Sequence, residues 1–216
     1  MNKYLKFSLI AAAALALAGR VSAVPTLMIS DGTTTYTIAD GAVGDANGST
    51  DAVTFIGTVG VWTVNVTTGI VSGTNQLPTL DLNSVDMSSG AGTLYIYFSA
   101  DGFGPSSGGV TASVGGTTSG TTSFKTAYSA SDLLFRGSLL TGQTFTGPAF
   151  SGTAGSAIAV EGLYSLTELA VITHTGSGTT SFDMTVSVPD SGTTVMLLGA
   201  ALTALGLFAR SRKQAA

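Results

Sequence analysis

Short runs of β-branched and aromatic residues recur along residues 24–187, and Gly, Ser and Thr separate them. In the run 60–69, the apolar residues Trp62, Val64 and Val66 alternate with polar ones. Successive side chains of a strand point to opposite faces, so an alternation with a period of two predicts a strand with one buried face.

Other segments of the same kind predict further strands. They cover residues 26–30, 34–39, 52–57, 92–100, 109–116 and 123–130. The segment 92–100 is apolar on both faces, which predicts a central strand of a two-layer structure. Residues 132–140 fit either a strand or a short helix.

The clearest pattern lies in residues 162–188, which read as two strands around the turn Gly176-Ser177-Gly178. Apolar residues alternate with polar ones along the second strand, at Phe182, Met184, Val186 and Val188. No segment keeps a helical period over three turns. Many short strands joined by Gly/Ser/Thr turns predict an all-β fold, an antiparallel β-sandwich of jelly-roll or Ig-like type. A parallel β-solenoid is the alternative, but the chain has no fixed repeat period.

The mean hydropathy of +0.44 reflects two apolar ends. At the N-terminus, two lysines precede a 13-residue apolar stretch, residues 7–19, and the small-residue site Val21-Ser22-Ala23 follows. This order predicts a secretory signal peptide over residues 1–23, cut between Ala23 and Val24. A short membrane anchor or a buried helix is the alternative, although the stretch is short for a bilayer crossing.

The C-terminus holds a second apolar stretch, the 17 uncharged residues 193–209. A helix of this length spans about 25 Å, enough for a thin membrane crossing. Arg210, Arg212 and Lys213 follow directly. Positive charge is retained on the cytoplasmic side, so the two ends together predict an exported body with its tail inside.

The body between these ends is strongly acidic. Residues 24–187 contain eleven acidic side chains and two basic ones, Lys125 and Arg136, for a net charge of −9. Such a surface repels phosphate backbones, which makes nucleic acid an improbable partner. The chain has no cysteine, so an exported domain of this length relies on its packed core rather than on disulfides.

Few residues suit catalysis. His174 is the only histidine, and no G-x-S-x-G motif surrounds any serine. The common zinc sites need several His or Cys ligands. Glu161 and Glu168 are a formal glycosidase pair, but such pairs arise by chance in an acidic β-protein. We therefore expect no enzymatic activity.

The loop "GDANGSTDA" offers one candidate metal site. Asp45, Asn47, Ser49 and Asp51 place oxygen ligands at alternate positions, as a Ca²⁺ loop does. The match is incomplete, because the glycine is misplaced and the twelfth position is Ile56. A polar hairpin loop explains the same composition. No other cofactor is indicated.

Aromatic residues offer one candidate ligand platform. Tyr95, Tyr97, Trp62 and Tyr128 are the types that stack on sugars. Aromatic residues on strands also serve in the core or in cross-strand pairs, so both interpretations stay open.

The segment Val188-Pro189-Asp190-Ser191-Gly192, followed by the apolar stretch and the basic tail, resembles the C-terminal sorting signal of the PEP-CTERM class in its VPDSG-CTERM variant. The resemblance covers roughly the last 26 residues. It implies an exported Gram-negative bacterial protein. It also implies that a membrane-embedded exosortase recognises the tail and cuts near the motif, and that the released body joins the cell surface or an extracellular polysaccharide matrix.

Together these features predict three parts: a signal peptide (1–23), a secreted β-sandwich (24–187) and a sorting signal (188–216) with its motif (188–192), transmembrane helix (193–209) and basic tail (210–216). The expected function is that of a sorted envelope protein with a structural or matrix-interacting body. A carbohydrate-binding module is the alternative, and a glycoside hydrolase comes third.

Overall fold

The computed structural model describes residues 23–189 together with Gly199, Leu202 and Thr203. Residues 23–189 form twelve strands, which are β1 (Thr26–Ser30), β2 (Thr35–Ala39), β3 (Ala52–Val59), β4 (Trp62–Thr74), β5 (Leu77–Ser88), β6 (Gly92–Phe103), β7 (Ser106–Thr118), β8 (Thr121–Ser129), β9 (Ser138–Phe145), β10 (Ala149–Val160), β11 (Tyr164–His174) and β12 (Gly178–Ser187). The expected signal peptide lies outside the described residues except for Ala23, and the expected helix at 193–209 lies outside them except for Gly199, Leu202 and Thr203.

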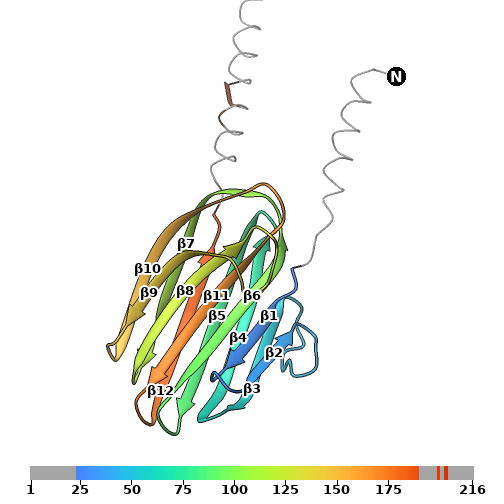
Figure 1. Cartoon of the computed structure of the whole chain (residues 1–216). Coiled ribbons are helices and arrows are strands. Elements are labelled where there is room, and N and C mark those ends of the chain that lie inside the picture. The colour runs from blue at the N-terminus through green and yellow to red at the C-terminus, as the bar shows by residue number, and fades with distance from the viewer. Residues whose placement is uncertain (1–22, 190–198, 200–201, 204–216) are drawn as a thin grey trace, which may run out of the picture.

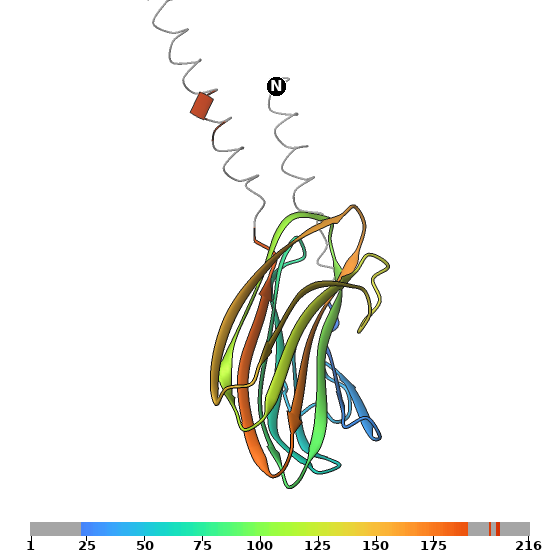
Figure 2. The same ribbon diagram turned by 60° about the vertical axis from the view of Figure 1, so that its left-hand side comes forward.

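The strands form two six-stranded sheets, and every pairing is antiparallel. The first sheet has the order β2-β1-β6-β11-β8-β9, and the second has the order β10-β7-β12-β5-β4-β3. They lie face to face as two layers (Figures 1 and 2). This arrangement confirms the predicted all-β sandwich.

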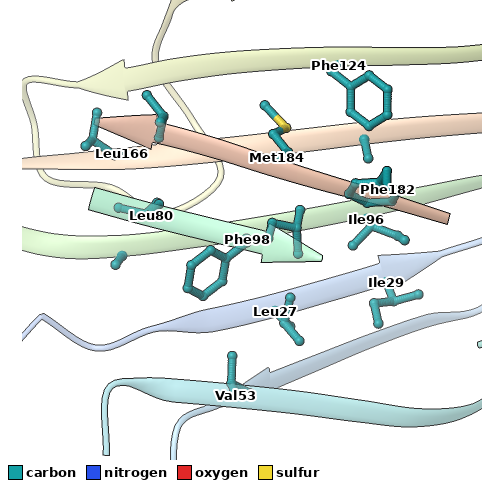
Figure 3. Close-up of a cluster of buried hydrophobic side chains, with 14 of the residues drawn as sticks. Leu27, Ile29, Val53, Leu80, Ile96, Phe98, Phe124, Leu166, Phe182 and Met184 are labelled. Atoms are coloured by element: carbon teal, nitrogen blue, oxygen red, sulfur yellow. The ribbon is translucent and has the colours of Figure 1, made fainter. Parts of the chain in front are cut away.

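The hydrophobic core lies between the two sheets (Figure 3). Strand β6 contributes Leu94, Ile96 and Phe98, all with no exposed surface. Phe182 of β12 meets Phe124 of β8 edge-on across the layers, with ring centroids 5.1 Å apart. The alternation along β12 that predicted one inner face therefore fills this core, and β6, predicted as a central strand, lies in the interior of its sheet.

The sequence pattern misses two strands, β5 and β10. Strand β5 lies in the interior of the second sheet, between β12 and β4, and β10 lies at that sheet's edge. In β5 the inward positions change from Leu80 and Leu82 to Ser84, Asp86 and Ser88, which are all buried. Half of the buried positions of β5 are therefore polar, so the strand shows no continuous hydrophobic alternation in the sequence.

Residues 132–140 are neither a single strand nor a helix. Strand β9 begins only at Ser138, and a loop occupies residues 130–137. Asp132 and Phe135 in this loop have left-handed backbone angles, with φ of 56° and 59°. Gly137 lies so close to the Tyr128 carbonyl that a Cβ would overlap it. This local geometry turns the chain before it enters β9.

In the part of the chain that the structure describes, no helix reaches the length and apolarity of a membrane span.

Candidate functional site

The sandwich ends inside the motif Val188-Pro189-Asp190-Ser191-Gly192. Strand β12 lies between β5 and β7 and ends at Ser187. The Val188 N–H still donates to the Pro78 carbonyl at 3.0 Å, and the Val188 side chain is only 2% exposed. Pro189 is exposed and has no N–H to continue the pairing. The first motif residue is thus part of the core, and the second is the first that solvent reaches.

The family model for the VPDSG-CTERM motif matches residues 187–213. The chain carries a VPDSG-CTERM sorting signal. This signal is a variant of the PEP-CTERM type that exosortases process, and it indicates export and membrane processing. The other residues predicted for the motif and its basic tail lie outside the described part of the chain: Asp190, Ser191, Gly192, Arg210, Arg212 and Lys213.

Comparison with solved structures gives distant similarities only. TmCBM61 in complex with beta-1,4-galactotriose is 10% identical, with 60% of this chain and 90% of that chain covered and a TM-score of 0.34. The C-terminal CBM6 of LamC from Zobellia galactanivorans is 15% identical, with 48% and 78% covered and a TM-score of 0.28. The K1 cleaved adhesin domain of Lys-gingipain from Porphyromonas gingivalis W83 is 12% identical, with 64% and 98% covered and a TM-score of 0.31. These scores are too low to indicate a ligand. No curated protein matches the sequence.

The expected signal cleavage site lies at the start of the sandwich. Ala23 is 8% exposed, whereas Val24 is 48% exposed. The Val24 backbone nitrogen donates to Asp101 Oδ1 at 3.3 Å. If the chain is cut before Val24, this nitrogen becomes an ammonium group beside a carboxylate.

The candidate calcium loop is closed by its own hydrogen bonds. Asp45 Oδ1 accepts from the N–H groups of Asn47 and Thr54, both at 2.9 Å, and Oδ2 accepts from the Gly41 N–H at 3.0 Å. Burial raises the pKa of Asp45, but these three donors outweigh it, so the pKa is lowered overall. Its carboxylate is thus occupied within the chain.

The other candidate ligands of this loop also have roles in the turn. Asn47 Oδ1 accepts from the Ser49 N–H at 3.0 Å. Asp51 has a left-handed backbone with φ of 65°, and its N–H donates to Asp40 Oδ2 at 2.8 Å. Within residues 23–189, no three His, Cys, Asp or Glu side chains gather as a metal site.

Replacing Asp45 with alanine is expected to lower the free energy of unfolding by about 1–3 kcal/mol, because three backbone N–H groups lose their acceptor. If the loop is only a turn, Asp45→Ala should lower the melting temperature by the same amount in Ca²⁺ as in EDTA. Asp51→Asn is the control, because the Asp51 carboxylate accepts none of these loop bonds. A calcium loop would instead make wild type melt lower in EDTA, and Asp51→Asn would reduce that shift.

His174 ends β11 and lies in the core with 2% exposure. Its Nδ1 is 2.7 Å from Ser88 Oγ, and its Nε2 is 2.8 Å from Thr180 Oγ1. The imidazole also lies against the Trp62 ring, with centroids 4.8 Å apart. Burial lowers the pKa of His174, which favours the neutral ring. Both nitrogens are therefore engaged inside the core.

The formal carboxylate pair is divided between surface and interior. Glu161 is exposed in the connection between β10 and β11, whereas Glu168 is fully buried in β11. A glycosidase needs both groups at one scissile bond, which this placement does not offer.

The four aromatic residues of the proposed platform are divided as well. Trp62 is 1% exposed, and Tyr128 packs against the core. Tyr95 and Tyr97 alternate with the buried Leu94, Ile96 and Phe98, so they lie on the outer face of the first sheet.

Proposed function

We propose that the chain is an exported envelope protein whose tail is recognised and cut by an exosortase-like membrane protease. The observation that carries this proposal is the sorting motif placed directly at the end of a folded sandwich, with Val188 buried and Pro189 exposed.

This placement divides the motif into Val188, which is part of the folded sandwich, and the residues from Pro189 onward, which follow it. Val188 is fixed by its hydrogen bond to Pro78 and by the core, so a protease can bind in extended form only from Pro189 onward. Every strand of the sandwich precedes that point. A cut after Pro189 therefore leaves the fold intact, and the body is then free to move from the inner membrane to the cell surface or the medium.

The proposed signal cleavage between Ala23 and Val24 is consistent with this sequence of export and tail processing. The new ammonium group at Val24 would form an ion pair with Asp101, and ion pairs near a surface contribute up to about 1 kcal/mol. The apolar stretch 193–209 and its basic tail then hold the exported body at the membrane until the protease acts.

For the body we propose a structural or matrix-interacting role rather than an enzymatic one. Engagement of His174 inside the core and the separation of Glu161 from Glu168 support this view. The second candidate is a carbohydrate-binding module. Strands β5 to β12 support a jelly-roll assignment, because they follow the orders β10-β7-β12-β5 and β6-β11-β8-β9, and this architecture is used by lectin domains.

The test is an intact-mass measurement on protein recovered from membrane and medium of the native host, with a purification tag inserted at the exposed turn after Gly90. We expect wild type to begin at Val24 and to lack the residues that follow the motif. Replacing Pro189, Asp190, Ser191 and Gly192 with alanines should leave the C-terminus whole and the protein in the membrane.

The control replaces Ser211 and Gln214 with alanine, which leaves the motif and the tail charges unchanged. This variant should be cut like wild type. If wild type and the motif variant both stay intact and membrane-bound, the chain is permanently anchored and the sorting proposal is wrong.

A further inference from the structure

A groove lies on the outer face of the first sheet, outside the core and far in sequence from the sorting motif. It encloses about 240 Å³. We call it the cationic groove and define it by Tyr97, Lys125, Phe135, Arg136, Leu139 and Leu169. Three strands provide its floor, and the loop 130–137 and the start of β9 provide its wall.

The floor is a row of residues in register across β6, β11 and β8, which lie side by side in Figure 1. Leu169 of β11 pairs with Tyr97 on one side and with Lys125 on the other. Their neighbours Phe98, Ala170 and Phe124 point into the core, so these three point outward. Strands are spaced about 4.8 Å apart, which sets Tyr97 and Lys125 roughly 10 Å from each other.

The wall is fixed to the sheet by three hydrogen bonds. Asp132 Oδ1 accepts from the Gly102 N–H at 2.8 Å, and the Leu133 carbonyl accepts from Ser165 Oγ at 2.7 Å. The Phe135 N–H donates to Ser99 Oγ at 3.3 Å. Strands β6 and β11 thus fix the loop before any ligand arrives.

Phe135 is held in an unfavourable backbone conformation. Its φ of 59° is left-handed, which costs about 1–3 kcal/mol for a residue with a side chain. The result is a defined ring position, because Phe135 meets Tyr97 edge-on with centroids 6.1 Å apart. Both residues are half-buried and line the groove, so they form a preorganised aromatic corner there.

The charge of the groove is opposite to that of the body. Lys125 and Arg136 are the only basic residues between positions 24 and 187, against eleven acidic ones, and both line this groove. Both are exposed, and neither side chain makes an ion pair or hydrogen bond within the described chain. The positive charge of the groove is therefore not offset by an ion pair within the described chain, and a bound anion would offset it.

We propose that the cationic groove binds an acidic saccharide, with sugar carboxylates at Lys125 and Arg136 and a sugar ring against Tyr97 and Phe135. An arginine fork binds carboxylates in two parallel hydrogen bonds, and an aromatic face packs on the apolar face of a sugar. The groove is smaller than the 300–1,000 Å³ typical of small-molecule pockets, so it holds a short segment of a chain. The surrounding acidic surface would repel a densely charged polyanion. It repels a saccharide with one carboxylate per sugar less strongly.

This inference rests on the proposed extracellular location, where such polysaccharides occur, and it names the ligand class for the body. Its test is independent of sorting. The full chain, purified in a non-ionic detergent, is titrated calorimetrically with oligogalacturonate and with its methyl ester, which keeps the rings and removes the charge. Failure of tail processing leaves this measurement unaffected, and failure of binding leaves the processing experiment unaffected.

Wild type should bind the acid at least tenfold more tightly than the ester, and binding should weaken with added salt. Lys125→Gln and Arg136→Gln should each weaken acid binding by about tenfold or more, as expected for loss of the charge-assisted hydrogen bonds of that side chain. Tyr97→Val should weaken binding of the acid as well, because it removes the stacking face but keeps a strand-forming residue.

The matched control is Thr111→Glu. Thr111 is exposed on the outward side of β7 in the other sheet, and this variant lowers the net charge by the same one unit as Lys125→Gln. It should bind the acid nearly as wild type does. Equal binding of acid and ester, or equal losses in Thr111→Glu and Lys125→Gln, would overturn the proposal, as would acid binding that survives both cation variants. No binding of either sugar would overturn it too.

Discussion

Replacing Phe98 with alanine is expected to lower the free energy of unfolding by about 3–5 kcal/mol, the usual cost of removing a large buried side chain. Phe98 lies at the centre of β6, has no exposed surface and points between the two sheets (Figure 3). Denaturant unfolding measures the loss as a lower midpoint at an unchanged m-value. Ile70→Ala is the control, since Ile70 is 39% exposed and its truncation should cost much less.

The effect of removing the Phe98 side chain is coupled to a glycine in the opposite sheet. Gly69 of β4 lies under the Phe98 ring, and a Cβ at position 69 would overlap it. Gly69→Ala should therefore destabilise wild type, because overpacking typically costs about 1–3 kcal/mol. In the Phe98→Ala background the same methyl group enters a cavity, so Gly69→Ala should be neutral or stabilising. Additive losses in the double mutant would show that the two sites do not share this space.

The strands whose inner faces are mostly apolar were predictable from sequence. In β4 the predicted alternation holds at Trp62 and Val64, but a register shift between Val64 and Val66 leaves Val66 half-buried and buries Thr67 instead. Strand β12 keeps its period of two as an inner and an outer face. Strand β6, predicted as a central strand, lies in the interior of its sheet with Leu94, Ile96 and Phe98 facing the core. Apart from the shift in β4, local pattern and tertiary burial agree in these strands, which is why the β-sandwich class is correct.

Strands β5 and β10 were not predictable, for two different reasons. The inner face of β5 turns polar because partners on other strands satisfy it: Thr67 Oγ1 lies 2.6 Å from Ser84 Oγ, and Ser88 Oγ meets His174. Strand β10 has mostly Gly, Ser and Ala side chains and depends on its twelve-residue pairing with β7. In both cases the stabilising partner is distant in sequence.

The sorting motif at the C-terminus could be predicted from sequence because its residues are contiguous. The cationic groove could not be predicted, since its residues are dispersed along the chain. Tyr97, Lys125 and Phe135 become neighbours only through the strand order β6-β11-β8. The sequence does show that the body has two basic residues. What it lacks is the register that brings Tyr97 and Lys125 to the same face of the sheet.

Glu168 gives the prediction with the second largest effect, a change in how stability depends on pH. Its side chain points into the core from the middle of β11 and has no exposed surface. Burial raises the pKa of Glu168 well above its usual value, and the negative charges of Asp81 and Asp183 raise it further. The Val186 amide opposes this shift weakly, and neither carboxyl oxygen has a hydrogen-bond partner.

A raised pKa means that the folded state keeps a proton that the unfolded state releases. Above the unfolded value of about 4.3 for Glu, the folded state binds more protons, so the free energy of unfolding falls as pH rises. Asp86 adds to this trend, because burial raises its pKa to about 7 despite a 2.8 Å hydrogen bond from Ser84. His174, with a lowered pKa, acts in the opposite direction as pH falls through the range near 6.5.

Glu168→Gln and Glu168→Met are therefore expected to stabilise the protein at neutral pH. Gln keeps the shape but cannot ionise, and Met also removes the unpaired polar atoms, which cost about 1–3 kcal/mol when buried. For a domain of this size each kcal/mol raises Tm by about 2–4 °C. Melts from pH 4 to 8 should show wild type losing stability as pH rises, and both variants should show a shallower slope that retains the Asp86 contribution. Glu161→Gln, which changes an exposed carboxylate, should leave the slope unchanged. If Glu168→Gln and Glu168→Met both lower Tm at pH 7 while wild type gains stability with rising pH, then Glu168 is charged and paired in the folded state, and its burial has a different explanation.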